Sequence, residues 1–513
     1  MENFLKINRE FLSYYQLKTG RQKLLVEEMG RPMIAHMNAI YALILNQAKG
    51  YQPVWLNNNK YDSALIQSYF PNSEAVKNIA FPLLWKIYAS LIALLKFPKI
   101  LLTKDILSFS FDNVKYGDIV YDDYLIMYKV ATIKKIGWRL IKVMAICIFR
   151  HLKIKKILKR ENFAGVLVSH QVGIRSGILL RTALRYGYHG YLRSDSILYD
   201  FKQIDEIYNY PLKPSPQEID QIIEKLGPKL EIIFKQVLEK HVAGLSTKDG
   251  LHAFDKNKHL YTDKHEFNTA FKLSSDKKNI FVMLHAFVDS PHSHFKWMIF
   301  KDYYDWFYQT LQFAKKHPEY NWIFKQHPSV KYYYTGDVDF VKLFADCPNN
   351  IIYLDNDHQI DTRSLIYCAD LVVTCLGSAG FELPAMGGVP SVTAADNFYT
   401  GLGFALEPKN QTEYFALLSQ ADKITKLTPK QQQRAKATFV YIREYALPPI
   451  SFRPKLSFDE EKDRKINDWY WSRVENIYST KKEEIIKEIN NNIEAVKQPD
   501  FKKLTSLADL LKL

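Results

Sequence analysis

The feature that most constrains the fold of this chain is an alternation of short apolar runs with amphipathic segments between residues 278 and 394. The apolar runs are rich in β-branched residues and end in polar ones, as buried parallel strands do, whereas the intervening segments have helical periodicity. We expect strands at 278–287, 321–328, 350–355, 370–378 and 389–394. Four or five strand–helix units in succession predict a Rossmann-like domain with a parallel sheet.

A second unit of the same kind begins at Phe163. Residues 163–170 form a β-branched run, residues 171–188 have helical periodicity, and another short run follows at 189–193. The first 160 residues are predicted to be mostly helical, and the chain past Pro448 becomes helical and charged. Two Rossmann-like halves with C-terminal helices predict an α/β chain of the GT-B class, in which the ligand lies in a cleft between two facing domains.

This organisation predicts three parts. Residues 1–270 form an N-terminal Rossmann-like domain with helical, basic additions, and residues 271–450 form a second Rossmann-like domain. Residues 451–513 form helices that pack back on these domains. The charged stretch from Asp255 to Lys278 is assigned as the interdomain region.

Charge and cysteine content narrow the range of partners. Lysine and arginine exceed aspartate and glutamate by 15, which favours an anionic partner such as a nucleotide, an acidic glycan or a membrane surface. The basic residues follow no nucleic-acid-binding motif, so nucleic acid is not expected as a partner. The four cysteines have no zinc-site or disulfide-framework spacing, so we expect no metal and a reducing, cytoplasmic environment.

Two stretches, residues 81–104 and 134–160, are both apolar and basic. Lysines interrupt the first, and its longest uncharged run, 87–95, is too short to cross a bilayer, so no transmembrane helix is expected. Two interpretations fit the pattern: a helix that docks on the inner face of the cytoplasmic membrane, and a helix that buries one face and exposes a basic one.

In open α/β sheets ligands bind at the carboxyl ends of the strands, so residues that follow the predicted strands are candidates for the site. Lys325 and His327 follow one strand and are predicted to lie on one side of the chain, and Pro328 stops the strand. A cation and an imidazole in that position suit a phosphate group that leaves with negative charge.

A turn of small residues opens the helix after the strand at 370–378. It consists of Gly377, Ser378, Ala379 and Gly380. Its backbone N–H groups and the helix N-terminus suit a phosphate or diphosphate, and Glu382 is expected to reach a ribose hydroxyl. The alternative is a tight packing turn with Glu382 merely favourable to the helix dipole.

Three further residues after strands carry reactive groups. Asp289 follows the first strand of the second domain, where a carboxylate can act as general base or nucleophile, and a capping or loop role is the alternative. His170 and Arg175 follow the clearest strand of the first domain. We assign His170 as a second candidate base and Arg175 as a contact to the acceptor. The acidic pair Asp122–Asp123 is interpreted as a solvated turn.

The runs 377–390 and 397–404, together with the Lys-Gln-His-Pro element at 325–328, resemble the bacterial capsule-polysaccharide biosynthesis family that contains the β-Kdo transferases. Members have a serine-rich turn followed by Gly-Phe-Glu, a Gly-x-Pro strand entry, an aromatic loop and a His-Pro element. The resemblance extends from about residue 279 to 408. It departs from the pattern in having one serine, Ser378, where a pair is common, and Leu402 where an aromatic residue is expected.

The resemblance implies a GT-B glycosyltransferase that moves a sugar, such as a CMP-activated Kdo or related ulosonic acid, to a surface-polysaccharide or glycolipid acceptor. His327, Pro328 and the serine turn would hold the nucleotide phosphate, and a loop containing Asn397 and Tyr399 would shape the donor site. No cofactor or metal beyond the nucleotide-sugar substrate is expected. The alternatives are a polymerase that transfers an alditol phosphate from a CDP donor, and a non-catalytic subunit of glycan assembly.

Overall fold

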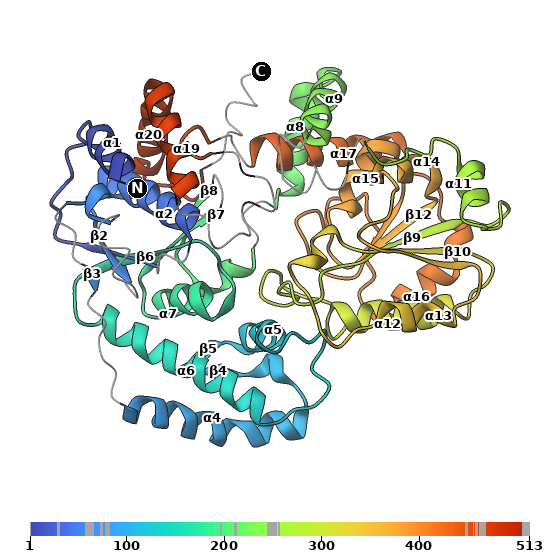
Figure 1. Cartoon of the computed structure of the whole chain (residues 1–513), viewed down its shortest axis with the longest axis horizontal. Coiled ribbons are helices and arrows are strands. Elements are labelled where there is room, and N and C mark those ends of the chain that lie inside the picture. Colours follow the sequence, from blue (N-terminus) through green and yellow to red (C-terminus); the bar gives the residue numbers. More distant parts are fainter. Residues whose placement is uncertain are drawn as a thin grey trace. The chain divides into compact units, whose positions relative to one another are not determined.

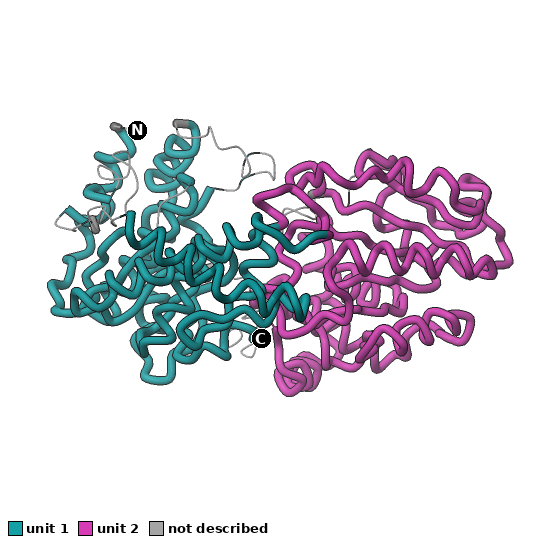
Figure 2. Tube along the Cα trace, turned by 90° about the horizontal axis from the view of Figure 1, so that it is seen from below, with its two compact units in different colours: residues 1–124, 135–211, 447–505 teal, residues 125–134, 212–446, 506–513 magenta. Residues whose placement is uncertain are grey.

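The computed structural model describes most of the chain in two compact units (Figures 1 and 2). The described residues are 2–27, 31–56, 66–71, 75–76, 83–194, 197–209, 213–243, 254, 257–446, 450–454, 456, 460 and 468–504. Unit 1 comprises residues 1–124, 135–211 and 447–505, and unit 2 comprises 125–134, 212–446 and 506–513. The first boundary was predicted at residue 270, whereas residues 212–270 belong to unit 2.

Unit 1 is built on a six-stranded sheet in the order β3-β2-β1-β6-β7-β8. All neighbours pair in parallel except β7 and β8, which form an antiparallel edge. The strands are β1 (Lys23–Val26), β2 (Gln52–Leu56), β3 (Ala75–Val76), β6 (Phe163–Val168), β7 (His189–Ser194) and β8 (Ile197–Phe201). The first three strands lie inside the part that was predicted to be mostly helical, so the sheet begins far earlier in the chain than Phe163.

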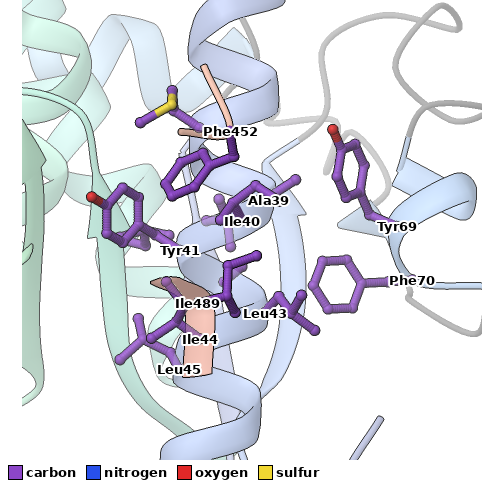
Figure 3. Packing of buried hydrophobic residues seen from close by; sticks show 14 of the residues in the cluster. Ala39, Ile40, Tyr41, Leu43, Ile44, Leu45, Tyr69, Phe70, Phe452 and Ile489 are labelled. Carbon is purple, nitrogen blue, oxygen red and sulfur yellow. The ribbon is translucent and has the colours of Figure 1, made fainter. Parts of the chain in front are cut away.

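The helices of unit 1 come from both ends of the chain. They are α1 (Glu2–Leu12), α2 (Pro32–Lys49), α4 (Leu83–Thr103), α5 (Gly117–Tyr128), α6 (Trp138–Leu158), α7 (Ile178–Arg185), α19 (Asp468–Thr480) and α20 (Lys482–Lys497). Helix α2 is buried without interruption from Ala35 to Asn46. Figure 3 shows Phe452 and Ile489, from the C-terminal part, among the apolar side chains of α2. The C-terminal helices therefore complete the core of unit 1.

Unit 2 contains a five-stranded parallel sheet in the order β11-β10-β9-β12-β13. Its strands are β9 (Asn279–Met283), β10 (Asn321–Lys325), β11 (Ile351–Leu354), β12 (Leu371–Thr374) and β13 (Ser391–Thr393). Its helices include α8 (Pro216–Leu226), α9 (Lys229–Val242), α11 (Lys264–Ala270), α12 (Tyr303–Ala314), α13 (Phe340–Ala345), α14 (Leu365–Cys368), α15 (Ala379–Gly387), α16 (Gln411–Ser419) and α17 (Pro429–Val440).

Both sheets reverse their direction of growth once. In unit 2 the chain adds β10 and β11 on one side of β9 and then returns to place β12 on the other side. In unit 1 it adds β2 and β3 beside β1 and returns with β6. Such a reversal opens a crevice at the carboxyl ends of the two central strands, where open α/β sheets bind ligands. The predicted fold class, an α/β chain with two Rossmann-like units, is confirmed.

The two apolar, basic stretches correspond to α4 and α6. Residues 81 and 82 lie outside the described residues, and the rest of the first stretch forms α4. Helix α6 buries one face, including Val143, Cys147 and Ile154, so the predicted buried face is present. Among the residues that the structure describes, none of the helices combines the length and apolar character that spanning a bilayer requires.

Candidate functional site

The reversal point of the unit 2 sheet brings together the segments that follow β9 and β12. His285 follows β9, and its Nε2 lies 3.2 Å from the backbone nitrogen of Leu376 and 3.2 Å from Thr374 Oγ1. Thr374 Oγ1 in turn accepts a hydrogen bond from the N–H of Gly377 at 3.0 Å. The imidazole and the small-residue turn are therefore one hydrogen-bonded assembly.

His285 is a neutral acceptor in this assembly. Burial and the neighbouring His327 lower its pKa to about 3, so it carries no charge at neutral pH. Its Nε2 accepts the Leu376 N–H, which leaves the ring proton on Nδ1. The ring stacks on Tyr303 with centroids 4.6 Å apart, and the His327 ring lies 6.5 Å away at an interplanar angle of 16°. His285 therefore contacts the turn directly and has the His327 ring as a neighbour.

The turn presents two backbone N–H groups at the start of α15. Within the described part of the chain, no acceptor is recorded for the backbone N–H of Ser378 or Ala379, whereas those of Gly380 and Phe381 donate back into the turn. Ser378 is partly exposed, so its hydroxyl is accessible to a ligand. Uncommitted N–H groups at a helix N-terminus favour an anion. The turn therefore carries N–H donors at a helix N-terminus, and anion binding by Gly377 to Gly380 stays a prediction.

Tyr399 and Asn397 lie in the interior of the next loop, both fully buried. The Tyr399 hydroxyl donates to the Gly377 carbonyl at 3.1 Å, and a Cβ atom at Gly380 would lie only 2.0 Å from that hydroxyl oxygen. Asn397 donates to Thr393 Oγ1 at 2.9 Å and accepts from the Tyr399 N–H at 2.9 Å. These internal bonds fix the loop and join it to the turn, and the prediction that this loop shapes the donor site stays a prediction.

Glu382 is held by two basic side chains. Its Oε1 accepts from Arg443 of the π-helical turn η7 (Tyr441–Tyr445) and lies 3.2 Å from Nε2 of His241 in α9. Arg443 and His241 lower the pKa of this buried carboxyl to about 2. A carboxylate engaged in this way connects α15 to two other helical segments through Oε1, and the ribose contact expected from the sequence stays a prediction.

Lys325 and His327 have different neighbours. Lys325 is buried, and burial together with Lys258 lowers its pKa to about 8, whereas Asp361 opposes the shift. His358 is close enough to Lys325 for its own pKa to be lowered to about 3 by burial and by that lysine. Strand β10 ends at Lys325, so the side-chain alternation of a strand does not extend to His327. That Lys325 and His327 lie on one side of the chain therefore stays a prediction. The structure records His285 as the ring neighbour of His327.

The remaining residues after β9 and β10 lie near the same edge. Pro328 begins a 3-10 turn, η4 (Pro328–Lys331), whereas β10 already ends three residues earlier, at Lys325. Asp289 is exposed at the end of an otherwise buried turn, with its N–H donating to the Ala286 carbonyl at 2.9 Å. His292 and His294 are partly buried nearby. Across the described ranges, His, Cys, Asp and Glu side chains form no group of three or more suited to holding a metal ion.

The reversal point of the unit 1 sheet is organised by Glu27, which follows β1. Its carboxylate is 1% exposed and accepts from the Ser169 N–H at 2.7 Å and from Ser176 Oγ at 2.5 Å. Ser169 follows β6, and Ser176 lies in the π-helical turn η2 (Gly173–Gly177). His170 is exposed beside this assembly, and Arg175 is partly buried, with its carbonyl accepting from Arg150 Nη2 at 3.4 Å.

A second carboxylate borders the same turn. Asp123 Oδ2 accepts from the Ile174 N–H at 2.9 Å, and burial raises the pKa of Asp123 to about 7. The interpretation of Asp122–Asp123 as a solvated turn is wrong: both lie in helix α5, and Asp122 is buried. A carboxyl that titrates near neutral pH is suited to general acid–base chemistry. The sequence offered no sign of this, because Asp123 and Ile174 are 51 positions apart.

Neither a protein-family model nor a curated protein matches this chain. Solved structures similar to it include KpsC, a β-Kdo 2,4-transferase of Thermosulfurimonas dismutans, at 13% identity over 56% of this chain and 85% of that chain, with a TM-score of 0.31. Anabaena Alr3699/HepE, in complex with UDP-glucose, is 12% identical over 92% and 99%, with a TM-score of 0.25. The spinosyn rhamnosyltransferase SpnG, complexed with spinosyn aglycone, is 10% identical over 82% and 96%, with a TM-score of 0.24.

Proposed function

We propose that this chain is a glycosyltransferase that binds the phosphate of a nucleotide-sugar donor at the turn from Gly377 to Gly380. The observation that carries the proposal is the pair of N–H groups of Ser378 and Ala379 at the N-terminus of α15, next to the carboxyl end of β9, for which the described residues supply no backbone acceptor. An anion held there is stabilised by the helix dipole and by hydrogen bonds to rigid backbone donors.

The chemistry requires stabilisation of the leaving nucleotide and removal of a proton from the acceptor. When the sugar–phosphate bond breaks, negative charge develops on the phosphate oxygens, and we assign the N–H groups of Ser378 and Ala379 and a ring N–H of His327 as the donors to them. In this proposal these groups supply the electrostatic stabilisation, with Lys325 a further cation behind the strand end, and no metal ion is assigned a part.

We propose three candidates for the group that removes the proton from the acceptor hydroxyl. Asp289 and His170 are the candidates from the sequence, and Asp123 joins them because its pKa of about 7 matches the working range of a general base. Arg175 would contact an acidic acceptor. For the donor we propose a CMP-activated ulosonic acid such as Kdo, on the strength of the Ser-Ala-Gly-Phe-Glu and His-Pro elements, and for the acceptor a surface polysaccharide or glycolipid.

A thermal-shift panel with CMP, CDP, UDP and GDP at about millimolar concentration tests the phosphate site. We expect one nucleotide to stabilise the wild type and this stabilisation to disappear in His327→Ala, because ligand binding to the folded state raises the melting temperature. His317→Ala is the matched control. His317 is the histidine of the other His-Pro dipeptide, follows the end of α12, and pairs with Glu319 at 2.7 Å.

The pattern of nucleotides decides between donors. A shift with CMP supports the ulosonic-acid donor, and a larger shift with CDP than with CMP supports transfer of an alditol phosphate. If no nucleotide stabilises the wild type, or if His317→Ala abolishes the shift as completely as His327→Ala, the proposed phosphate site is wrong and a non-catalytic role in glycan assembly becomes the better explanation.

A further inference from the structure

Helix α4 exposes an unusually large apolar surface. Of its 21 residues only Ala89, Ala93 and Ile100 are buried. Nine large apolar side chains are exposed along the helix: Leu83, Leu84, Ile87, Tyr88, Leu91, Leu94, Leu95, Leu101 and Leu102. The exposed fractions of Leu84, Leu95 and Leu102 are 73%, 81% and 83%. A contiguous exposed surface of this kind in a soluble unit indicates a site of interaction.

The exposed residues share one face of the helix. At about 100° per residue, the nine side chains fall within an arc of roughly 140°, and the buried Ala89, Ala93 and Ile100 lie on the opposite side. The two small alanines, one helical turn apart, let α4 pack closely on α6, which is the helix it contacts most. Figure 1 shows α4 at the lower edge of unit 1, beyond α6. The packing of α4 within the unit is therefore complete without this apolar face.

The charge around this face has one sign. Residues 83–104 contain Lys86, Lys96, Lys99 and Lys104 and no acidic residue, and residues 134–160 contain ten lysines and arginines and again no acidic residue. This concentration accounts for much of the net charge of +15. An apolar strip bordered by lysines matches the interface of a bilayer that carries negative headgroups.

Helix α6 extends the surface at one end. Lys156, near the end of α6, lies with its Nζ 4.9 Å from the centroid of the Trp85 ring near the start of α4, so the two packed helices run antiparallel. The start of α6 therefore lies beside the end of α4. There Trp138 is 68% exposed, next to the exposed Arg139. An aromatic residue beside basic ones is the composition that anchors proteins at the headgroup level.

We propose that α4, assisted by Trp138 at the start of α6, lies in the plane of an anionic phospholipid bilayer and inserts its apolar face among the acyl chains. The lysines bordering that face would pair with lipid phosphates. A bilayer is favoured over a second copy of the chain because two such faces would bring like charges together. The proposal goes beyond the proposed sugar transfer and does not depend on it.

Vesicle binding by the full chain tests the proposal. We expect binding to vesicles of phosphatidylcholine with about one third phosphatidylglycerol, weaker binding to phosphatidylcholine alone, and a loss of affinity of about fivefold for each lysine screened by salt. The triple variant Leu84→Gln, Leu95→Gln, Leu102→Gln should lose at least about tenfold per leucine. Because these side chains are exposed, the variant should keep the wild-type circular dichroism and melting temperature.

The matched control is Ile232→Gln with Val341→Gln, two exposed apolar residues of unit 2 that are 61% and 80% exposed. Its vesicle affinity should equal that of the wild type. The proposal is overturned if the wild type does not bind anionic vesicles, if the triple variant binds as well as the control, or if sedimentation shows a wild-type dimer that the triple variant dissociates without any vesicle binding. The nucleotide shift of the preceding section is measured without lipid, so a failure of either proposal is recognised separately.

Discussion

Substitution of Glu382 tests whether this carboxylate is a structural clamp or a ligand contact. In the structure it is buried and engaged by Arg443 and His241, which lower its pKa to about 2 from an ordinary value of 4.5. The difference between these two pKa values corresponds to about 3 kcal/mol of stability at neutral pH. Removing one partner of a buried ion pair costs about 3–5 kcal/mol, which agrees with this figure.

We therefore expect Glu382→Gln to lower the free energy of unfolding of unit 2 by about 3 kcal/mol at pH 7. The pH dependence has a defined sign. Because the pKa is lower in the folded protein, the stabilisation is fully present well above 4.5 and is lost as the pH falls toward 2. The difference between the wild type and Glu382→Gln should accordingly shrink in that window and stay constant between pH 6 and pH 8.

Urea unfolding followed by tryptophan fluorescence measures this difference. Glu231→Gln serves as the control, because Glu231 pairs with Lys436 at 2.6 Å but its side chain is 48% exposed, so its loss should cost less than about 1 kcal/mol. Nucleotide affinity of the folded Glu382→Gln protein should be unchanged. A variant with wild-type stability and weakened nucleotide binding would refute the clamp and restore the ribose contact inferred from the sequence.

Two further substitutions test the turn and the unit 1 carboxylate. Gly380→Ala should lower the free energy of unfolding by about 1–3 kcal/mol in thermal or urea unfolding, because the new methyl group would meet the buried Tyr399 hydroxyl. The control is Gly137→Ala, at a position where the new methyl group has open space, and it should not destabilise the protein. Equal stability of the two variants would contradict the tight turn. Asp123→Asn should stabilise the protein above pH 7 and have little effect below pH 4, because burial raises the pKa of Asp123 to about 7 and ionisation of this buried carboxyl opposes folding. The measurement is the melting temperature of both proteins across that pH range. A difference that does not change with pH would rule out the raised pKa.

The amino-acid sequence by itself determined the parallel sheet of unit 2 and the positions of its loops. The pattern that specifies each strand and helix there is local, so β9, β10, β11, β12 and β13 all fall within the predicted segments. The turn at Gly377 to Gly380 was likewise recognisable, because small residues between a strand and a helix have a local conformational meaning. In unit 1 the short strands β1 and β2 lie between long helices, and their four and five residues were too few to show a periodicity.

The tertiary structure decided which side chains meet, because that depends on strand order and not on any local pattern. Glu27 and Ser169 are 142 positions apart and come together only because β6 pairs with β1. Glu382 contacts Arg443 and His241 from separate helical segments, a buried ion pair that no local pattern around Glu382 predicts. The same holds for the surface of α4: its apolar and basic composition is evident in the sequence, but only the packing of Ala89 and Ala93 toward the unit shows which face remains exposed.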